Sequence, residues 1–201
     1  MDNHERQLVQ QFIQDSSAVG LLYTEQLSTI TRSVAKIPWG KGRSIREVLG
    51  DKKVGTCTGK HLVLQACYQE LGIAFRSVVC VFMWKDQTIQ FPDHIRSILN
   101  EGAWGHGHNF VQVKNEQGEF VDVDVTFDSQ LQQHGFRVFP VDWNGSKSMP
   151  IAFDPIIKRW DNADMPLLKK QLIDSLDKAT RDRRERFLNA LIEWVDLLHT
   201  K

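Results

Sequence analysis

The sequence predicts an α+β fold, in which helices at both ends of the chain flank a small set of strands. Apolar residues recur at helical spacing near the N-terminus and again from residue 166 onward. Residues 75–84 form a β-branched and aromatic run that is typical of a buried strand. Residues 109–114 and 119–125 alternate between apolar and polar side chains and are separated by the turn signal Asn-Glu-Gln-Gly, which predicts a β-hairpin.

Several helices are predicted before the first strand. They cover residues 5–15, 24–35, 45–49 and 58–71. The Gly- and Pro-containing segment 37–42 separates the second from the third as a loop. Gly72 is well placed to end the last of them in a left-handed conformation.

The rest of the chain is predicted to be less regular until its last part. Residues 86–107 are expected to be irregular apart from a short helix at 94–99, and residues 136–139 are expected to form a strand. From Pro166 onward the apolar pattern predicts two amphipathic helices. These helices fit a lid, a pair that completes the core, or a dimer contact, and the sequence leaves the three roles open.

Composition limits the function classes. The 201 residues match one domain, or one domain with a helical appendage, and 25 basic and 25 acidic residues give a formal net charge of zero. This balance argues against a nucleic-acid binder that relies on a broad basic surface. The N-terminus contains no apolar run typical of a signal peptide, and no stretch is apolar enough for a membrane span. Three cysteines do not suggest a disulfide framework, so we expect a reduced, cytoplasmic protein.

Cys57 has the setting of a reactive thiol. It lies in the segment Gly-Thr-Cys-Thr-Gly, directly before a predicted helix, so amides of the first turn would point near its sulfur. Such a position can lower a thiol pKa from about 8.5 to roughly 3.5–7.5. Cys67 lies mid-helix and Cys80 inside an apolar strand, and both are predicted to be small buried apolar side chains.

The predicted hairpin supplies a base and a carboxylate. His108 begins its first strand and Asp124 ends its second, so closing the hairpin brings both to one end. Pairing of His108 with Asp124 requires a three-residue loop, 115–117, followed by Gly118. A two-residue slip would bring Asp122 opposite His108 instead, which makes Asp122 a secondary candidate. The opposite face carries a row of valines suited to a core: Val111, Val113, Val121, Val123 and Val125.

These segments resemble the transglutaminase-like superfamily over about residues 39–126. The stretch from Gly55 through Cys57 to Phe75–Val79 looks like its nucleophile segment. His108–Val113 resembles its histidine strand, and Asp124-Val125-Thr126 resembles its Asp-Pro-Thr carboxylate segment. The order Cys, His, Asp and the 16-residue step from 108 to 124 match as well.

The resemblance implies a papain-like core, with the cysteine at the start of a helix that packs on an antiparallel sheet. It places a catalytic domain at residues 1–164 and a C-terminal helical extension, packed on the same domain, at 165–201. Members of the superfamily include protein cross-linking acyltransferases, peptide-cleaving and glycan-amide-cleaving hydrolases, and proteins that have lost activity. Val125 replaces the usual proline and Phe110 the usual tryptophan, which the hairpin geometry tolerates.

The expected activity is therefore a thiol-dependent amide or ester hydrolase or acyltransferase with Cys57, His108 and Asp124 as its triad. Candidate groups for stabilising the oxyanion are the backbone amide of Cys57 and the side chains of Trp39 and Trp104. No cofactor is expected. The substrate class is a peptide, a protein or a small amide, whereas the acyl acceptor and the oligomeric state are left open.

Two other functions stay open. The first is a metal-dependent hydrolase, because side chains of the types that bind a catalytic metal occur at His106, His108, Asp122 and Asp124. His61 and His94 are further possible ligands. His61 is, however, expected to lie at the surface. The second alternative is an inactive transglutaminase-like domain whose C-terminal helices bind a partner. Sensitivity to iodoacetamide or to a chelator separates the thiol site from the metal site.

Overall fold

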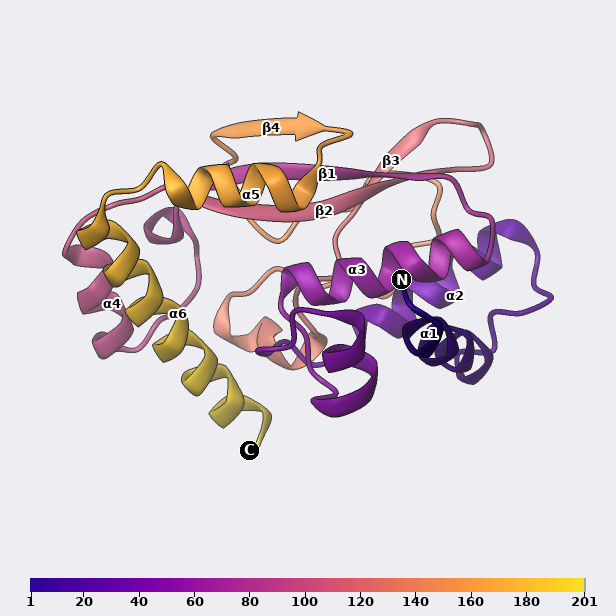
Figure 1. Ribbon diagram of the computed structural model, residues 1–201, viewed down its shortest axis with the longest axis horizontal. Coiled ribbons are helices and arrows are strands. Elements are labelled where there is room, and N and C mark those ends of the chain that lie inside the picture. Colours follow the sequence, from indigo (N-terminus) through magenta and orange to yellow (C-terminus); the bar gives the residue numbers. More distant parts are fainter. Residues whose placement is uncertain (201) are drawn as a thin grey trace.

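The structure, a computed structural model, describes residues 1–200. Within these residues a four-stranded antiparallel sheet has the strand order β3-β2-β1-β4 (Figure 1). The strands are β1 (Phe75–Phe82), β2 (His106–Lys114), β3 (Phe120–Val123) and β4 (Lys158–Asp161). Cys57 begins a helix that packs on this sheet, so the expected α+β class is confirmed.

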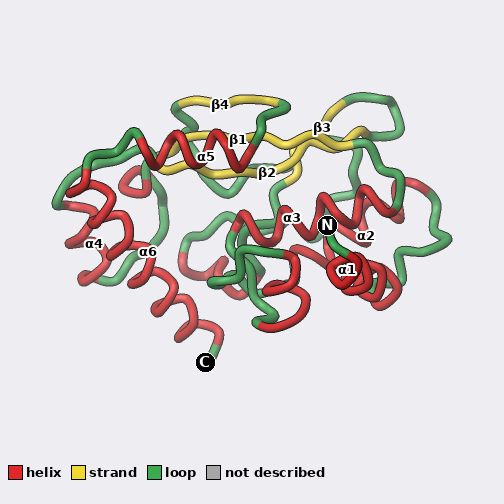
Figure 2. The backbone as a smooth tube through the Cα atoms, in the orientation of Figure 1, coloured by secondary structure: helices red, strands yellow, loops and turns green. Residues whose placement is uncertain are grey.

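Helices surround the sheet unevenly (Figure 2). They are α1 (Asn3–Asp15), α2 (Tyr23–Ala35), α3 (Cys57–Glu70), α4 (Asp93–Asn100), α5 (Met165–Asp174) and α6 (Lys178–His199), with short helical turns η1 (Arg46–Asp51), η2 (Trp84–Asp86) and η3 (Ser129–His134). α3 contacts β2 and in turn packs on α1 and α2. α5 runs beside β1 and β2, while α6 leads away from it to pack on α4.

The two faces of the hairpin separate as their alternation predicts. Val111 and Val123 lie in the same buried cluster as Val63 and Leu64 of α3. Phe110, at the alternate position, lies in a different buried cluster with strand β1. Each fully buried valine stabilises the fold by roughly 1.5–3 kcal/mol, which ties the hairpin to α3 and fixes where its end lies.

The register of the hairpin differs from the predicted one by two residues. Val111 pairs with Val123, and the Asn115 amide donates to the Glu119 carbonyl at 2.8 Å. The three-residue loop is therefore 116–118, with Gly118 in the left-handed region at φ 82°. Because a shift of two residues keeps each side chain on its original face, Asp124 still lies on the side of His108.

Two predictions about strands are wrong. Residues 136–139 form no strand, and Phe136 instead packs against the rings of Phe127 and Trp194. Strand β4 was not predicted, because its four residues include Lys158 and Asp161 and show no apolar alternation. Its pairing with β1 therefore depends on tertiary structure.

The C-terminal helices take part in the core. α6 buries Phe187, Leu191 and Val195 in an aromatic cluster that also contains Trp84. Completing the core, one of the three roles that the sequence left open for the C-terminal helices, is thus observed for α6. The division at residue 165 is not tested and stays a prediction. Among residues 1–200, no helix is both long enough and apolar enough to cross a membrane.

Candidate active site

The start of α3 holds Cys57 in place. Thr56 caps the helix: its hydroxyl oxygen accepts from the Gly59 amide at 3.2 Å, and its own amide donates to the Gly42 carbonyl at 2.8 Å. The amides of Cys57 and Thr58 lie in the first turn, where a helix offers them no acceptor of its own. The Cys57 thiol is half-buried, so its sulfur is accessible. It lies beside the unpaired backbone amides at the start of the helix.

The contact between the helix start and the loop of Gly42 permits no side chain at Gly59. A Cβ there would lie 2.3 Å from the Gly42 oxygen and 2.8 Å from Val48 Cγ2. We expect Gly59→Ala to lower the free energy of unfolding by about 1–3 kcal/mol, as overpacking does, in urea denaturation. Gly50→Ala is the control, because its Cβ would meet only Leu8 Cδ1 at 3.6 Å. Equal stability of the two variants would contradict this interpretation.

His108 and Asp124 form a buried hydrogen bond. The Nε2 atom of His108 lies 2.8 Å from Asp124 Oδ2. The same oxygen accepts from the Ala152 amide at 2.9 Å, while Oδ1 accepts from the amide and hydroxyl of Thr126 at 3.0 and 2.6 Å. Burial works against ionisation, but the charge and hydrogen bond of His108 hold the Asp124 pKa well below its usual range. The carboxylate is therefore charged and its orientation is fixed.

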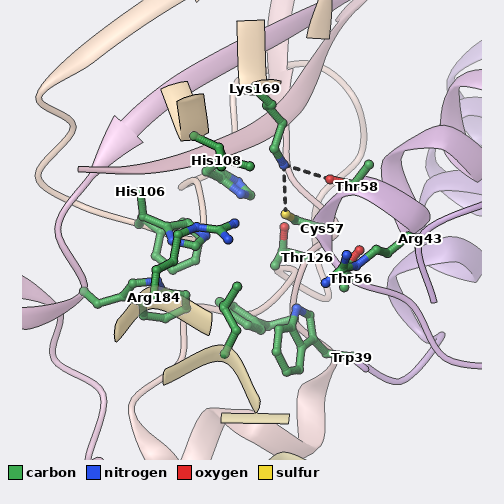
Figure 3. A pocket seen from close by; sticks show the side chains of 15 residues that line it. Trp39, Arg43, Thr56, Cys57, Thr58, His106, His108, Thr126, Lys169 and Arg184 are labelled. Atoms are coloured by element: carbon green, nitrogen blue, oxygen red, sulfur yellow. Dashed lines mark hydrogen bonds between the residues drawn. The ribbon is translucent and has the colours of Figure 1, made fainter. Parts of the chain in front are cut away.

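The other nitrogen of the His108 ring is left for the sulfur. Within residues 1–200 Nδ1 has no hydrogen-bond partner of ordinary geometry, and the ring lines the same pocket as Cys57 (Figure 3). Phe153 packs edge-on against the ring at a centroid distance of 4.7 Å. Burial lowers the His108 pKa, but Asp124 and then Cys57 outweigh it and raise the pKa to about 9. The ring is thus held as an imidazolium beside the thiol.

Lys169 is the site residue that sequence reasoning missed. It comes from α5, and its Nζ atom lies 3.8 Å from the Cys57 sulfur. It also donates to Thr58 Oγ1 at 2.8 Å and Asn109 Oδ1 at 2.9 Å (Figure 3). These two oxygens hold the ammonium directly above the sulfur. No local signal marks Lys169, because 112 residues separate it from Cys57.

The charges around Cys57 favour its thiolate. Burial raises the pKa of the thiol, but attraction to Lys169 and then the interaction with His108 outweigh burial and lower it to about 6. Burial raises the pKa of both Cys67 and Cys80. Between about pH 6 and pH 9 the site therefore holds a thiolate and an imidazolium, which is the reactive pair of a thiol nucleophile.

The pH dependence of alkylation tests this charge arrangement. The rate of iodoacetamide reaction at Cys57 should rise through pH 6 and level off, because only the thiolate attacks. In Lys169→Met the midpoint of the same curve should move to higher pH by roughly one to three units, as expected for loss of one nearby positive charge. Lys170→Met is the control, since Lys170 is exposed and pairs with Asp174. A wild-type midpoint above pH 8 would contradict the assignment.

His61 was expected at the surface, and this expectation is wrong. The side chain is fully buried; its Nδ1–H donates to the Cys57 carbonyl at 2.7 Å, and its Nε2 accepts from the Val125 amide at 3.2 Å. Burial lowers the pKa of His61 to about 4, so the ring is neutral. His61 thus links the cysteine turn to the segment that carries Asp124. Its position four residues after Cys57, on the same side of the helix, was the signal available.

A pocket of about 220 Å³ opens at the sulfur, between α3, the sheet and the C-terminal helices. Trp39 lines it, and its backbone amide donates to Asp128 at 2.8 Å. Trp104 is not among the residues that line the pocket and packs instead against Phe187, so the structure does not bring it to the sulfur. Ile173 of α5 and Leu188 of α6 also line the pocket. Both helices therefore contribute to the wall of the pocket, whereas the lid and dimer-contact roles stay predictions.

The ligand set of the alternative metal site does not come together. Asp122 accepts two hydrogen bonds from the Arg159 guanidinium, both at 2.7 Å, and a third from Gln112. His106 packs in the aromatic cluster beside Phe82 and Trp84. Within residues 1–200, no three His, Cys, Asp or Glu side chains are arranged to hold a metal ion. The arrangement instead gives Asp122 a structural role.

Among known proteins, only solved structures show a similarity to this chain. No protein-family model matches the chain, and no curated protein matches it. Among solved structures, one described as "Crystal structure of a TGase" is similar over 64% of this chain, with 12% sequence identity and a TM-score of 0.45. The matched region spans 33% of that structure's own chain.

Proposed function

We propose that this protein is a thiol-dependent amide or ester hydrolase or acyltransferase related to the transglutaminase-like proteins. The observation that carries the proposal is the convergence of three groups from separate elements. A half-buried thiol at the start of α3 lies beside an imidazole that is hydrogen-bonded to a buried carboxylate. In this combination the imidazole activates the thiol and the carboxylate orients the imidazole, which is the arrangement of a triad for nucleophilic catalysis.

The proposed reaction has two steps. The Cys57 thiolate attacks a carbonyl carbon, and the resulting oxyanion meets the free amides at the start of α3. The His108 imidazolium then gives its proton to the departing amine or alcohol, leaving a thioester on Cys57. In the second step neutral His108 takes a proton from water or from an amine, which attacks the thioester and regenerates the thiolate.

The remaining polar groups position these three. Asp124 keeps the ring oriented by accepting from its Nε2–H, with its other lone pairs held by Thr126 and Ala152. Lys169 favours the thiolate before attack. Since the mechanism needs Cys57 reduced, we further propose that the protein works in a reducing compartment such as the cytoplasm.

An activated ester tests the proposal without knowledge of the natural substrate. With p-nitrophenyl acetate we expect a rapid burst of p-nitrophenolate equal to one acyl group per protein, followed by slower turnover. Intact mass and peptide mapping should locate the acyl group on Cys57. Adding a primary amine reports the acceptor: faster turnover with amide formation indicates acyl transfer, and no change indicates hydrolysis. Absence of both burst and acylation would contradict the proposal and favour the inactive binding domain.

A further inference from the structure

The lining of the pocket is strongly one-sided in charge. It includes the basic side chains Arg43, Lys169 and Arg184 and no aspartate or glutamate. The chain as a whole has 25 basic and 25 acidic residues. The excess of positive charge at the sulfur is therefore a local arrangement and does not follow from overall composition.

Arg184 lacks a partner where its neighbours have one. It is half-buried, and within residues 1–200 its side chain makes no hydrogen bond and no ion pair. Arg183 and Arg186, on the same helix, both reach Glu101. Glu185 is the nearest acid in sequence, but it is exposed and forms no ion pair with Arg184.

A second guanidinium faces Arg184 across the pocket. Arg43 comes from the loop before η1 and Arg184 from α6, and both line the pocket that contains Cys57 (Figure 3). Burial lowers the Arg184 pKa, and Arg43 lowers it further, so the two like charges interact. Partly buried cations in proteins are normally paired, because desolvating them without a counter-charge is costly. Arg184 is the half-buried member of the pair, whereas Arg43 is exposed. Because no aspartate or glutamate lines the pocket, the counter-charge of Arg184 is expected to come from a ligand.

Lys169 is not expected to bind the counter-charge that a ligand would bring. Its ammonium is occupied by Thr58 and Asn109 and lies at the sulfur, where the acyl carbonyl has to react. Within residues 1–200 neither the Arg43 nor the Arg184 side chain makes a hydrogen bond or ion pair, so both can donate to a group further along the ligand. Their planar guanidinium groups match the paired oxygens of a carboxylate or phosphate. Apolar rings, including Trp39, Trp84 and Phe153, line the pocket and suit an apolar segment of the ligand.

We infer that the acyl substrate carries an anionic group, a carboxylate or a phosphate, which Arg43 and Arg184 bind while its carbonyl lies at Cys57. This inference rests on the proposed function and adds to it the substrate class: acyl donors with a negative charge near the scissile carbonyl. A neutral acyl donor would leave both guanidinium groups without a counter-charge and should react more slowly.

Two alkylating reagents of nearly equal size test the inference. Iodoacetate is anionic and iodoacetamide is neutral, so the ratio of their rate constants at Cys57, divided by the ratio for free N-acetylcysteine, reports attraction of an anion. We expect this ratio to fall by roughly tenfold in Arg184→Gln and in Arg43→Gln, the effect of one charge at partly screened distance. Arg184→Lys, which keeps the positive charge, should keep the normalised ratio close to its wild-type value.

Arg181→Gln is the matched control, because it removes the same charge from an exposed position of the same helix and should leave the ratio unchanged. Near-UV circular dichroism verifies that each variant is folded. An unchanged ratio in both Arg184→Gln and Arg43→Gln would overturn the inference. If neither reagent labels Cys57 faster than N-acetylcysteine, the proposed function itself fails.

Protection experiments identify the anion. Glutarate and inorganic phosphate are each added while iodoacetamide labels Cys57 in the wild-type protein and in Arg184→Gln. Protection by glutarate that is lost in the variant supports a carboxylate, and the same result with phosphate supports a phosphate. Protection that persists unchanged in Arg184→Gln would place the anion elsewhere and contradict the inference.

Discussion

Replacing Cys57 with alanine is expected to abolish the p-nitrophenolate burst and to lower turnover by at least about 10⁴-fold, because no other thiol in the pocket can form the thioester. The fold should be kept, since the side chain is half-buried and only its sulfur is removed. Stopped-flow absorbance gives the burst amplitude, and intact mass shows whether an acyl group remains on the protein.

Cys67→Ala is the control for this change. Cys67 is fully buried in the cluster between α3 and the sheet, so its loss should cost about 1–2 kcal/mol of stability and leave the burst intact. Loss of the burst in Cys67→Ala together with its persistence in Cys57→Ala would show that the nucleophile has been wrongly assigned.

Replacing Asp124 with asparagine is expected to lower the acylation rate by roughly 10²–10⁴-fold. Its two oxygens accept four hydrogen bonds, from His108, Ala152 and the amide and hydroxyl of Thr126. An asparagine amide nitrogen cannot accept, so whichever way the side chain is turned one backbone amide, that of Thr126 or that of Ala152, loses its acceptor. The His108 ring then loses its charged partner, and its pKa should fall from about 9.

The pH profile distinguishes this effect from simple loss of stability. In the wild type the acylation rate should rise through about pH 6 with the thiolate and decline through about pH 9 as the imidazolium deprotonates. In Asp124→Asn the upper limb should move to lower pH. Asp122→Asn is the control, because Asp122 pairs with Arg159 and does not touch His108. An equal loss of activity in both variants would argue against a specific role for Asp124.

Much of the candidate site could be predicted because it depends on local rules. A cysteine directly before a helix needs only a helix start and a cap, and Thr56 supplies the cap. The pairing of His108 with Asp124 depends on side-chain parity in a hairpin, which survives a register error of two residues. For this reason the hydrogen bond was anticipated even though the predicted pairing was wrong.

Two features of the sheet could not be predicted from local sequence patterns. Strand β4 carries charged residues and is held by its pairing with β1, so its own pattern resembles a loop. The expected strand at residues 136–139 has the right residue types, but Phe136 is taken up by packing against other rings. In both cases tertiary contacts override the preference of a short segment.

The fold class, the helix that presents Cys57 and the hairpin that presents His108 and Asp124 can be predicted from local sequence, because periodicity and turn chemistry act over a few residues. The position of Lys169 at the sulfur, and of Arg43 and Arg184 in the same pocket, follows from the packing of distant segments. Arg43 is separated from both Lys169 and Arg184 by more than a hundred residues of sequence. Electrostatic fields depend on distance through space, and only the packing of α5 and α6 on the core sets those distances.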